Sequence, residues 1–190
     1  TLRSFLPDPF HLKDMDKAVA RLMQAINVGE TIAVFGDYDV DGATSSALLI
    51  RYFRMLGIEL LYHIPDRQKE GYGPNATALL SLQARGATLV VTVDCGAVSF
   101  APLKAAADAG LDVIVLDHHK GAAELPVSVA VVNPNRLDEH SPFTHMAAVG
   151  VTFLTLVGLN QRLREAGYFN TRTEPKLMQL LDVVALGTVC

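Results

Sequence analysis

The chain alternates between short, continuous apolar runs and longer segments in which apolar residues recur every three or four positions. The continuous runs are rich in Val, Ile and Leu, which is typical of buried strands. They predict five strands, at about 31–35, 58–64, 88–94, 111–117 and 128–134. The periodic segments predict helices at about 14–27, 43–56, 75–85, 99–109, 146–166 and 174–186.

Strands that alternate with helices form a parallel sheet, because each parallel connection needs a crossover long enough to hold a helix. Strands without polar positions indicate that both faces of the sheet are covered. The pattern therefore predicts an α/β fold with a mostly parallel sheet of about five strands and helices on both faces. The 190 residues, 50% of them hydrophobic, suffice for one sizeable core, so we expect one domain over residues 1–190.

Three carboxylates follow the first predicted strand at alternate positions, Asp37, Asp39 and Asp41. On an extended chain this spacing would place them on one side, close together. Like charges that close raise one another's pKa and destabilise the fold unless a positive charge lies between them. A divalent cation would supply that charge, and oxygen ligands suit Mg²⁺ or Mn²⁺. The alternative is a solvated acidic loop in which Asp41 or Thr44 caps the next helix.

Two later strands also end in residues that can bind metal. Asp94 follows the third strand, and Asp117, His118 and His119 follow the fourth. The carboxyl ends of parallel strands share one edge of a sheet, so we expect these residues to meet the first acidic group. Together they fit two cations bridged by a carboxylate, for which Asp94 is the central candidate. Mixed His and Asp ligation without a thiolate favours Mn²⁺ over Zn²⁺, with Mg²⁺ as the alternative.

The adjacent histidines must point in different directions. One would ligate metal, while the other would meet a substrate phosphate or donate to a carboxylate. An isolated histidine pair is more often a loop without function, and only the acidic strand ends facing His118 and His119 favour the metal interpretation. Cys95 is interpreted as a small core residue rather than a nucleophile, because acidic surroundings disfavour its thiolate.

Composition narrows the classes of function. The net charge is −4, so the bulk composition gives no basic footprint for nucleic acid, although a local phosphate site stays compatible with it. Two cysteines argue against a disulfide framework and fit a reducing cytoplasm. No apolar run reaches about 18 residues and no leader pattern opens the chain, so neither a membrane span nor a signal peptide is expected. The apolar ending LLDVVALGTVC leads us to expect a fragment of a longer protein.

Eight motifs follow one another along nearly the whole chain: DPFHLKDMDKA (8–18), FGDYDVDGATS (35–45), IPDRQKEGYG (64–73), TVDCG (92–96), DHH (117–119), VVNPNR (131–136), AAVGVTF (147–153) and LLDVVALGTV (180–189). The tripeptide DHH alone is weak, but the ordered set is specific. In this order the motifs resemble those of the DHH phosphoesterase superfamily, and within it the single-strand-specific 5′→3′ DNA exonucleases.

The resemblance implies a two-subdomain enzyme with Mn²⁺ or Mg²⁺, as two ions, in its cleft. By position it implies that the metal ligands are Asp39, Asp41, Asp94, His118 and Asp182. It also implies that Asp37 and His119 are their close catalytic partners. For Asp182 the alternative is a surface or capping carboxylate on a helix.

Substrate contacts are expected mainly from the GYG loop. Arg67 would reach a phosphate and Tyr72 would stack on a base, whereas the alternative for Arg67 is ordinary solvated charge. His119 is a further candidate for contact with substrate phosphate. Gly150, near the start of a helix, would let backbone N–H groups approach a phosphate, and close helix packing is the alternative.

The implied activity is that of a metal-dependent phosphodiesterase that degrades single-stranded DNA 5′→3′ in DNA repair and recombination, in the cytoplasm, by two-metal activation of water. Chains of this type continue with a second catalytic subdomain and an oligonucleotide-binding domain, both expected to lie outside this fragment. One alternative is a pyrophosphatase, or a phosphodiesterase for short oligonucleotides or cyclic dinucleotides. Another is a non-catalytic metal-binding α/β module, which would need neither histidine.

Overall fold

A five-stranded parallel sheet forms the centre of this computed structural model, which describes residues 6–190. Residues 1–5 of the predicted domain lie outside the described residues. The strands lie in the order β2 (Leu61–His63), β1 (Ile32–Gly36), β3 (Leu89–Val93), β4 (Asp112–Leu116) and β5 (Ala130–Val132). All four neighbouring pairs are parallel. The prediction of a parallel sheet of about five strands is confirmed.

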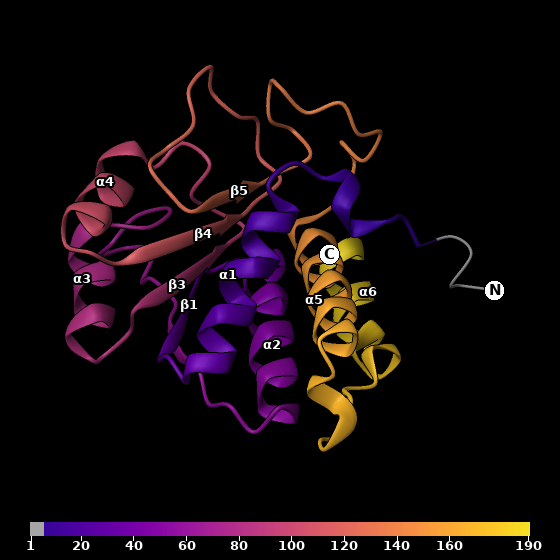
Figure 1. Cartoon of the computed structure of the whole chain (residues 1–190). Coiled ribbons are helices and arrows are strands. Elements are labelled where there is room, and N and C mark those ends of the chain that lie inside the picture. Colours follow the sequence, from indigo (N-terminus) through magenta and orange to yellow (C-terminus); the bar gives the residue numbers. More distant parts are fainter. Residues whose placement is uncertain (1–5) are drawn as a thin grey trace.

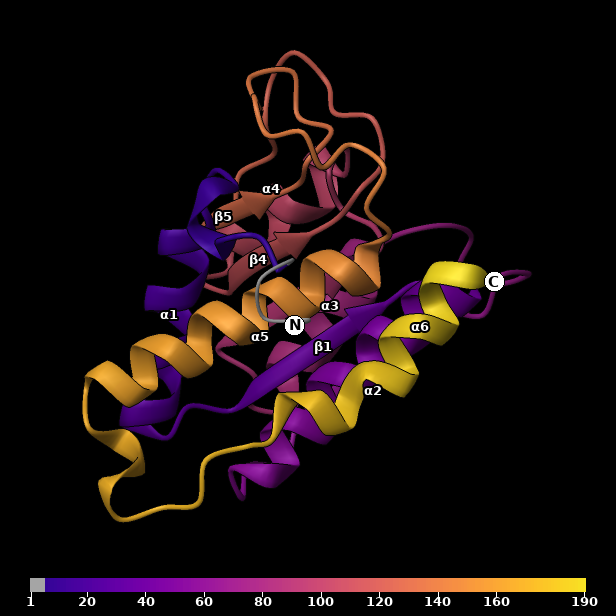
Figure 2. The same ribbon diagram turned by 90° about the vertical axis from the view of Figure 1, so that its right-hand side faces the viewer.

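One face of the sheet is covered by three long helices, α1 (Met15–Val28), α2 (Val40–Met55) and α5 (Ala148–Glu165) (Figure 1). A further helix, α6 (Leu181–Val189), packs on α2 and α5 and lies alongside α2 in Figure 2. These helices and the sheet share the larger of the two hydrophobic cores.

The opposite face is covered by two shorter helices, α3 (Ala76–Ala84) and α4 (Phe100–Asp108). Successive strand side chains point to opposite faces. Val34 therefore lies in the core beneath α1 and α2, whereas its neighbour Phe35 lies in the core beneath α3 and α4. Because both cores are apolar, the strands carry no polar alternation. Three short 3₁₀ turns complete the described elements: η2 (Pro9–His11), η3 (Tyr168–Asn170) and η4 (Leu177–Leu180). Among the described residues, every helix is too short or too polar to traverse a lipid bilayer.

The helix after the first strand begins earlier than predicted. α2 starts at Val40 rather than at about residue 43, and Asp39 is its N-cap, with its carboxylate accepting the Gly42 N–H at 2.9 Å. The prediction that the three carboxylates share one side of an extended chain was therefore wrong, although Asp37 and Asp39 do lie close together. Gly42 is required here because a Cβ would lie 2.6 Å from the Asp37 carbonyl oxygen.

The second strand and the last helix also differ from the prediction. β2 is shorter than about 58–64, since the Ile58 N–H bonds to the Phe53 carbonyl at the end of α2 instead of joining the sheet. The helix predicted at about 174–186 begins only with the turn η4 and continues as α6. Pro175 explains the delay, because the residue before a proline is disfavoured in helical conformation.

Candidate metal centre

Three aspartates extend the sheet by one residue at the ends of β1, β3 and β4. The Asp37 N–H bonds to the Val93 carbonyl at 3.3 Å, and the Asp94 N–H bonds to the Leu116 carbonyl at 2.9 Å. The Asp117 N–H likewise bonds to Val132 of β5 at 3.1 Å. These hydrogen bonds continue the parallel ladder, so the sheet itself fixes the spacing of the three backbones. The strand ends meet at one edge, as the order of elements predicted.

Asp94 is the most unusual carboxylate of this edge. Its side chain is 1% exposed, and neither of its oxygens has a hydrogen-bond partner. Its φ of 60° is uncommon for a residue other than glycine and marks local strain. Burial, together with the nearby Asp39 and Asp41 carboxylates, raises the Asp94 pKa to about 7, although His118 acts in the opposite direction.

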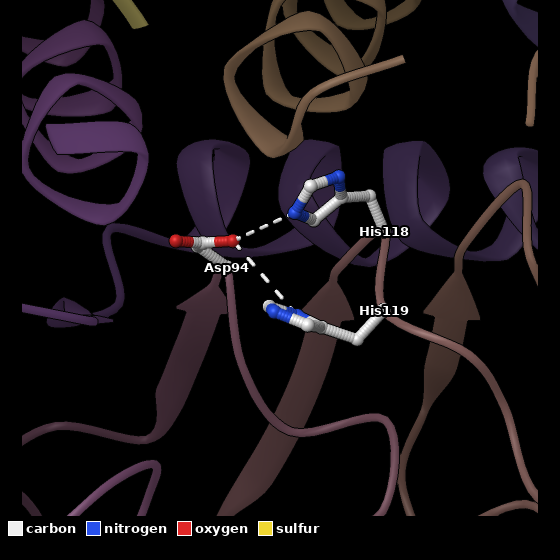
Figure 3. Close-up of side chains that lie close together, drawn as sticks. All are labelled: Asp94, His118 and His119. Atoms are coloured by element: carbon white, nitrogen blue, oxygen red, sulfur yellow. Dashed lines mark ion pairs between the residues drawn. The ribbon is translucent and has the colours of Figure 1, made fainter. Parts of the chain in front are cut away.

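Asp94 belongs to two groups of side chains whose ligand atoms lie within 4.8 Å of one another. One group is Asp94 with His118 and His119, which Figure 3 shows converging on the same carboxylate oxygen. His118 Nε2 lies 3.3 Å and His119 Nδ1 lies 3.9 Å from Asp94 Oδ1. The other group is Asp94 with Asp37 and Asp39. Two neighbouring cations that share one carboxylate would need this arrangement.

The two histidines are oriented by different partners. His118 Nδ1 lies 3.2 Å from the Met146 carbonyl, which can only accept, so Nδ1 carries the proton and Nε2 faces Asp94. His119 Nδ1 lies 2.8 Å from Asp117 Oδ1. The rings meet at 70° with centroids 4.7 Å apart, but both present a nitrogen to Asp94 Oδ1, so the expectation that they point in different directions was wrong.

Asp117 is buried but fully satisfied. Its carboxylate accepts the N–H groups of Ala97, His118 and His119 at 2.9, 2.7 and 3.2 Å. Burial raises the pKa of Asp117, but the bond to His119 and these backbone donors outweigh it, so its pKa lies below the ordinary value. The same pair raises the His119 pKa to about 9. Asp117 is therefore an ionised support for the histidines.

Asp37 resembles Asp94 rather than Asp117. It is buried, and its Oδ1 has no hydrogen-bond partner. Burial raises the pKa of Asp37, and the neighbouring Asp39 acts in the same direction. This edge of the sheet thus carries buried carboxylate oxygens that make no hydrogen bond.

Asp41 takes part in a different contact. Its two oxygens accept the N–H groups of Ala148 and Val149 at 2.7 Å each, so it caps the N-terminus of α5 rather than of its own helix. Asp41 Oδ2 lies 3.7 Å from His118 Nε2, but the residue belongs to neither group of three. That it binds metal stays a prediction.

The structure does not bring Asp182 to this edge. Asp182 lies in the first turn of α6, its side chain is 69% exposed, and it pairs with Arg51 of α2 at 3.4 Å. A Cβ on Gly187 would meet Thr44 of α2, so α6 runs antiparallel to α2. Arg51 follows Asp41 by ten positions, which is about 15 Å along the helix. The surface alternative, not the metal role, fits Asp182.

The predicted substrate residues have mixed outcomes. Tyr72, 53% exposed, points its hydroxyl to the Asp94 carbonyl at 3.3 Å and lies edge-on to the His119 ring. The Arg67 guanidinium lies 5.3 Å from the centre of the Tyr38 ring.

Gly150, the other predicted phosphate contact, lies in the first turn of α5. Its N–H bonds to the Ala147 carbonyl, and Asp41 accepts the N–H groups of the two preceding residues. A Cβ on Gly150 would lie 2.6 Å from Met146 Cγ, which favours the packing role for this glycine.

Sequence reasoning missed the groups that hold the histidines. These are the Met146 carbonyl and the side-chain amides of Asn133 and Asn135, which bond to the backbone of the histidine pair. The available signal was the motif VVNPNR, whose two asparagines follow the strand next to the histidines.

The chain is similar to several known proteins. The sequence matches the model of the DHH family, N-terminal domain, over residues 31–188. It is 40% identical over 182 residues to the single-stranded-DNA-specific exonuclease RecJ of Bacillus subtilis (strain 168), covering 96% of this chain and 22% of that protein. It is 43% identical over 181 residues to RecJ of Escherichia coli (strain K12), covering 94% of this chain and 31% of that protein.

A solved structure described as exonuclease RecJ bound to manganese superposes with a TM-score of 0.78 at 33% identity, covering 94% of this chain and 43% of that one. RecJ of Thermus thermophilus in complex with Mn²⁺ superposes with a TM-score of 0.73 at 31% identity, covering 94% of this chain and 24% of that one. The chain spans less than a third of the length of the curated relatives named above.

Proposed function

The chain belongs to the DHH family, and on that premise we propose that it is the metal-binding catalytic domain of an exonuclease specific for single-stranded DNA. In this proposal the domain occupies residues 1–190, holds two Mn²⁺ or Mg²⁺ ions, and hydrolyses phosphodiester bonds from the 5′ end. Relatives named as single-stranded-DNA-specific exonucleases, and relatives solved with Mn²⁺, support it.

The observation that carries the proposal is the buried carboxylate of Asp94, whose two oxygens make no hydrogen bond and which faces other carboxylates on one side and two histidines on the other. An ionised carboxylate without hydrogen bonds is costly in the protein interior, and a bound cation would offset this cost. Asp37 and Asp39 lie on one side of Asp94, and His118 and His119 on the other. The donor set is oxygen and imidazole without thiolate, which fits Mn²⁺ or Mg²⁺.

In this site Asp37, Asp39 and Asp94 would hold one cation, and Asp94 with His118 would hold the second. When bound, such a pair supplies positive charge that activates water and offsets charge on the phosphate oxygens. His118 presents Nε2 because Met146 holds the Nδ1 proton. His119 is held at Nδ1 by Asp117, and its other nitrogen, beside the Tyr72 hydroxyl, would face a phosphate oxygen of the substrate.

DNA would approach over the loop that carries Arg67 and Tyr72. Arg67 would contact phosphate, and Tyr72 would contact a base while its hydroxyl contacts the Asp94 backbone. The net charge of −4 supplies no general attraction for DNA, so strand recognition would depend on such local contacts and on further parts of a longer protein. The proposal places this activity in DNA repair and recombination in the cytoplasm.

The test compares substrates that separate this function from its alternatives. The chain, with Mn²⁺ or Mg²⁺, is incubated with 5′-phosphorylated single strands, the matching duplex, dinucleotides and pyrophosphate. We expect mononucleotides from the 5′ end of single strands only, and no product in EDTA. Faster hydrolysis of dinucleotides or pyrophosphate would assign the small-substrate activity instead. Tight Mn²⁺ binding without hydrolysis of any substrate would contradict the catalytic proposal.

A further inference from the structure

Two asparagines that follow strand β5 contact the backbone of the histidine pair. Asn133 Nδ2 donates to the His119 carbonyl at 2.8 Å, and Asn135 Nδ2 donates to the His118 carbonyl at 2.5 Å. The contacts join segments that follow the neighbouring strands β4 and β5. We call Asn133 and Asn135 the asparagine clamp.

The orientation of both amides follows from their partners. Asn133 Oδ1 accepts the Asn135 N–H at 2.8 Å, which leaves its nitrogen to donate. Asn135 Nδ2 donates to a second carbonyl, that of Thr144, at 3.1 Å. Since carbonyl oxygens only accept, each amide nitrogen must face them. Both clamp amides therefore donate through Nδ2 to the histidine backbone, and neither can be turned the other way without losing these bonds.

With the clamp, every backbone polar group of the histidine pair has a partner. Asp117 accepts both N–H groups, and the two asparagines donate to both carbonyls. The rings are held separately, by Met146 and Asp117. Loops that follow strands are ordinarily more mobile than the strands themselves. These hydrogen bonds therefore fix the backbone of His118 and His119.

The clamp is itself anchored. The buried Arg136 donates to the Val131 carbonyl and to Asp14 at 2.6 Å each, and it forms a two-pronged pair with Asp138 at 2.9 Å. The Gly121 N–H also bonds back to the Asn135 carbonyl at 3.1 Å. The turn that carries the asparagines is therefore held on both sides, toward α1 and toward the histidine segment.

We propose that Asn133 and Asn135 are positioning residues that hold His118 and His119 in the geometry required for metal binding. The inference rests on the proposed function and adds to it two residues that follow a fourth strand, β5. Functional side chains must be held within about 0.5 Å of their working positions. Partners that orient metal ligands change metal affinity by about 10- to 100-fold when they are removed.

The test measures Mn²⁺ affinity by calorimetry in the variants Asn133→Ala and Asn135→Ala. Asn160→Ala is the matched control, because Asn160 is also buried and loses two hydrogen bonds, to Tyr52 and Glu174, away from the histidines. We expect affinity about 10-fold lower or more in each clamp variant, and unchanged affinity in the control. Circular dichroism selects a temperature at which all variants are folded. If the Asn133 variant does not fold, the Asn135 variant alone provides the test, because Asn135 is only half-buried.

A second readout needs no metal. In ¹⁵N spectra of metal-free protein, we expect Asn133→Ala to shift the His119 ring signals and Asn135→Ala to shift those of His118, with no change in Asn160→Ala. Clamp variants with wild-type affinity and unchanged ring signals would overturn the inference while leaving the proposed function intact. Wild-type protein that binds no Mn²⁺ would instead overturn the proposed function, and the ring signals would then decide the positioning role separately.

Discussion

Replacing Asp94 by asparagine is expected to stabilise the metal-free protein while it abolishes Mn²⁺ binding. Asparagine keeps the shape of the side chain, removes the buried charge and tolerates a positive φ better than most residues. The gain follows from the Asp94 pKa, which burial raises from 3.8 to about 7. At about 1.4 kcal/mol per pH unit, the ionised carboxylate costs the folded state about 4 kcal/mol. The buried asparagine amide would itself lack hydrogen bonds, which costs the folded variant about 1–3 kcal/mol. The free energy of unfolding of the variant should therefore exceed that of wild type by about 1–3 kcal/mol.

The effect of Asp94 depends on pH with a defined sign. Its folded pKa lies above its unfolded pKa, so the folded state binds the proton more tightly. Wild-type stability therefore falls as pH rises from about 4 to about 7, and the asparagine variant lacks this fall. The two proteins should be similar at about pH 5 and should differ most at about pH 8.

Urea unfolding in EDTA at these two pH values gives the measurement, and Asp117→Asn gives the control. Asp117 is equally buried but accepts three backbone N–H groups and a histidine, so its replacement should destabilise the protein. Mn²⁺ at about 100 times its Kd should add about 2.7 kcal/mol to wild type and nothing to Asp94→Asn. If Asp94→Asn is destabilised at the higher pH as Asp117→Asn is, Asp94 carries no uncompensated charge and the reasoning fails.

Three further outcomes follow from individual contacts. Asp182→Asn should leave Mn²⁺ affinity unchanged and alter the free energy of unfolding by less than about 1 kcal/mol, because the pair with Arg51 is exposed; a tenfold loss of affinity would return Asp182 to the metal site. Gly187→Ala should destabilise the protein by about 1–3 kcal/mol, because the new Cβ would lie 2.2 Å from Thr44 Oγ1; unchanged unfolding in urea would show that α6 does not pack on α2 as described. Glu30, whose pKa is lowered by its hydrogen bond with Arg21, stabilises the fold above its unfolded pKa of 4.5 and loses this effect as pH falls. Glu30→Gln should therefore lower stability at neutral pH, with a difference from wild type that shrinks in acid; an equal difference at both pH values would contradict this.

The sheet could be predicted because its strands are buried on both faces. Their continuous apolar runs leave no helical period, and the glycines and prolines that bound them mark the ends within a few residues. The placement of Asp94 and His118 at one edge followed directly, since parallel strands end on the same side. The start of α2 was missed because Asp39 is its N-cap and accepts the Gly42 N–H. The sequence alone does not distinguish an aspartate that caps a helix from one on an extended segment.

Other parts of the site depend on contacts between distant segments. No local pattern predicts that Asp41 caps α5, more than a hundred positions away, or that the Met146 carbonyl holds His118. Asp182 was placed at the metal site through a motif, and a motif does not give the direction in which its helix packs. The roles of Asn133 and Asn135 become visible only once β5 is known to lie beside β4.

The central claim is that Asp94 lies between two cations held from three strand ends. Anomalous diffraction at the manganese edge, from crystals soaked in Mn²⁺, tests it most directly. The account predicts two peaks about 3.5–4 Å apart, one toward Asp37 and Asp39 and one toward His118, with Asp94 in contact with both. Peaks elsewhere, or none within bonding distance of Asp94, would contradict it.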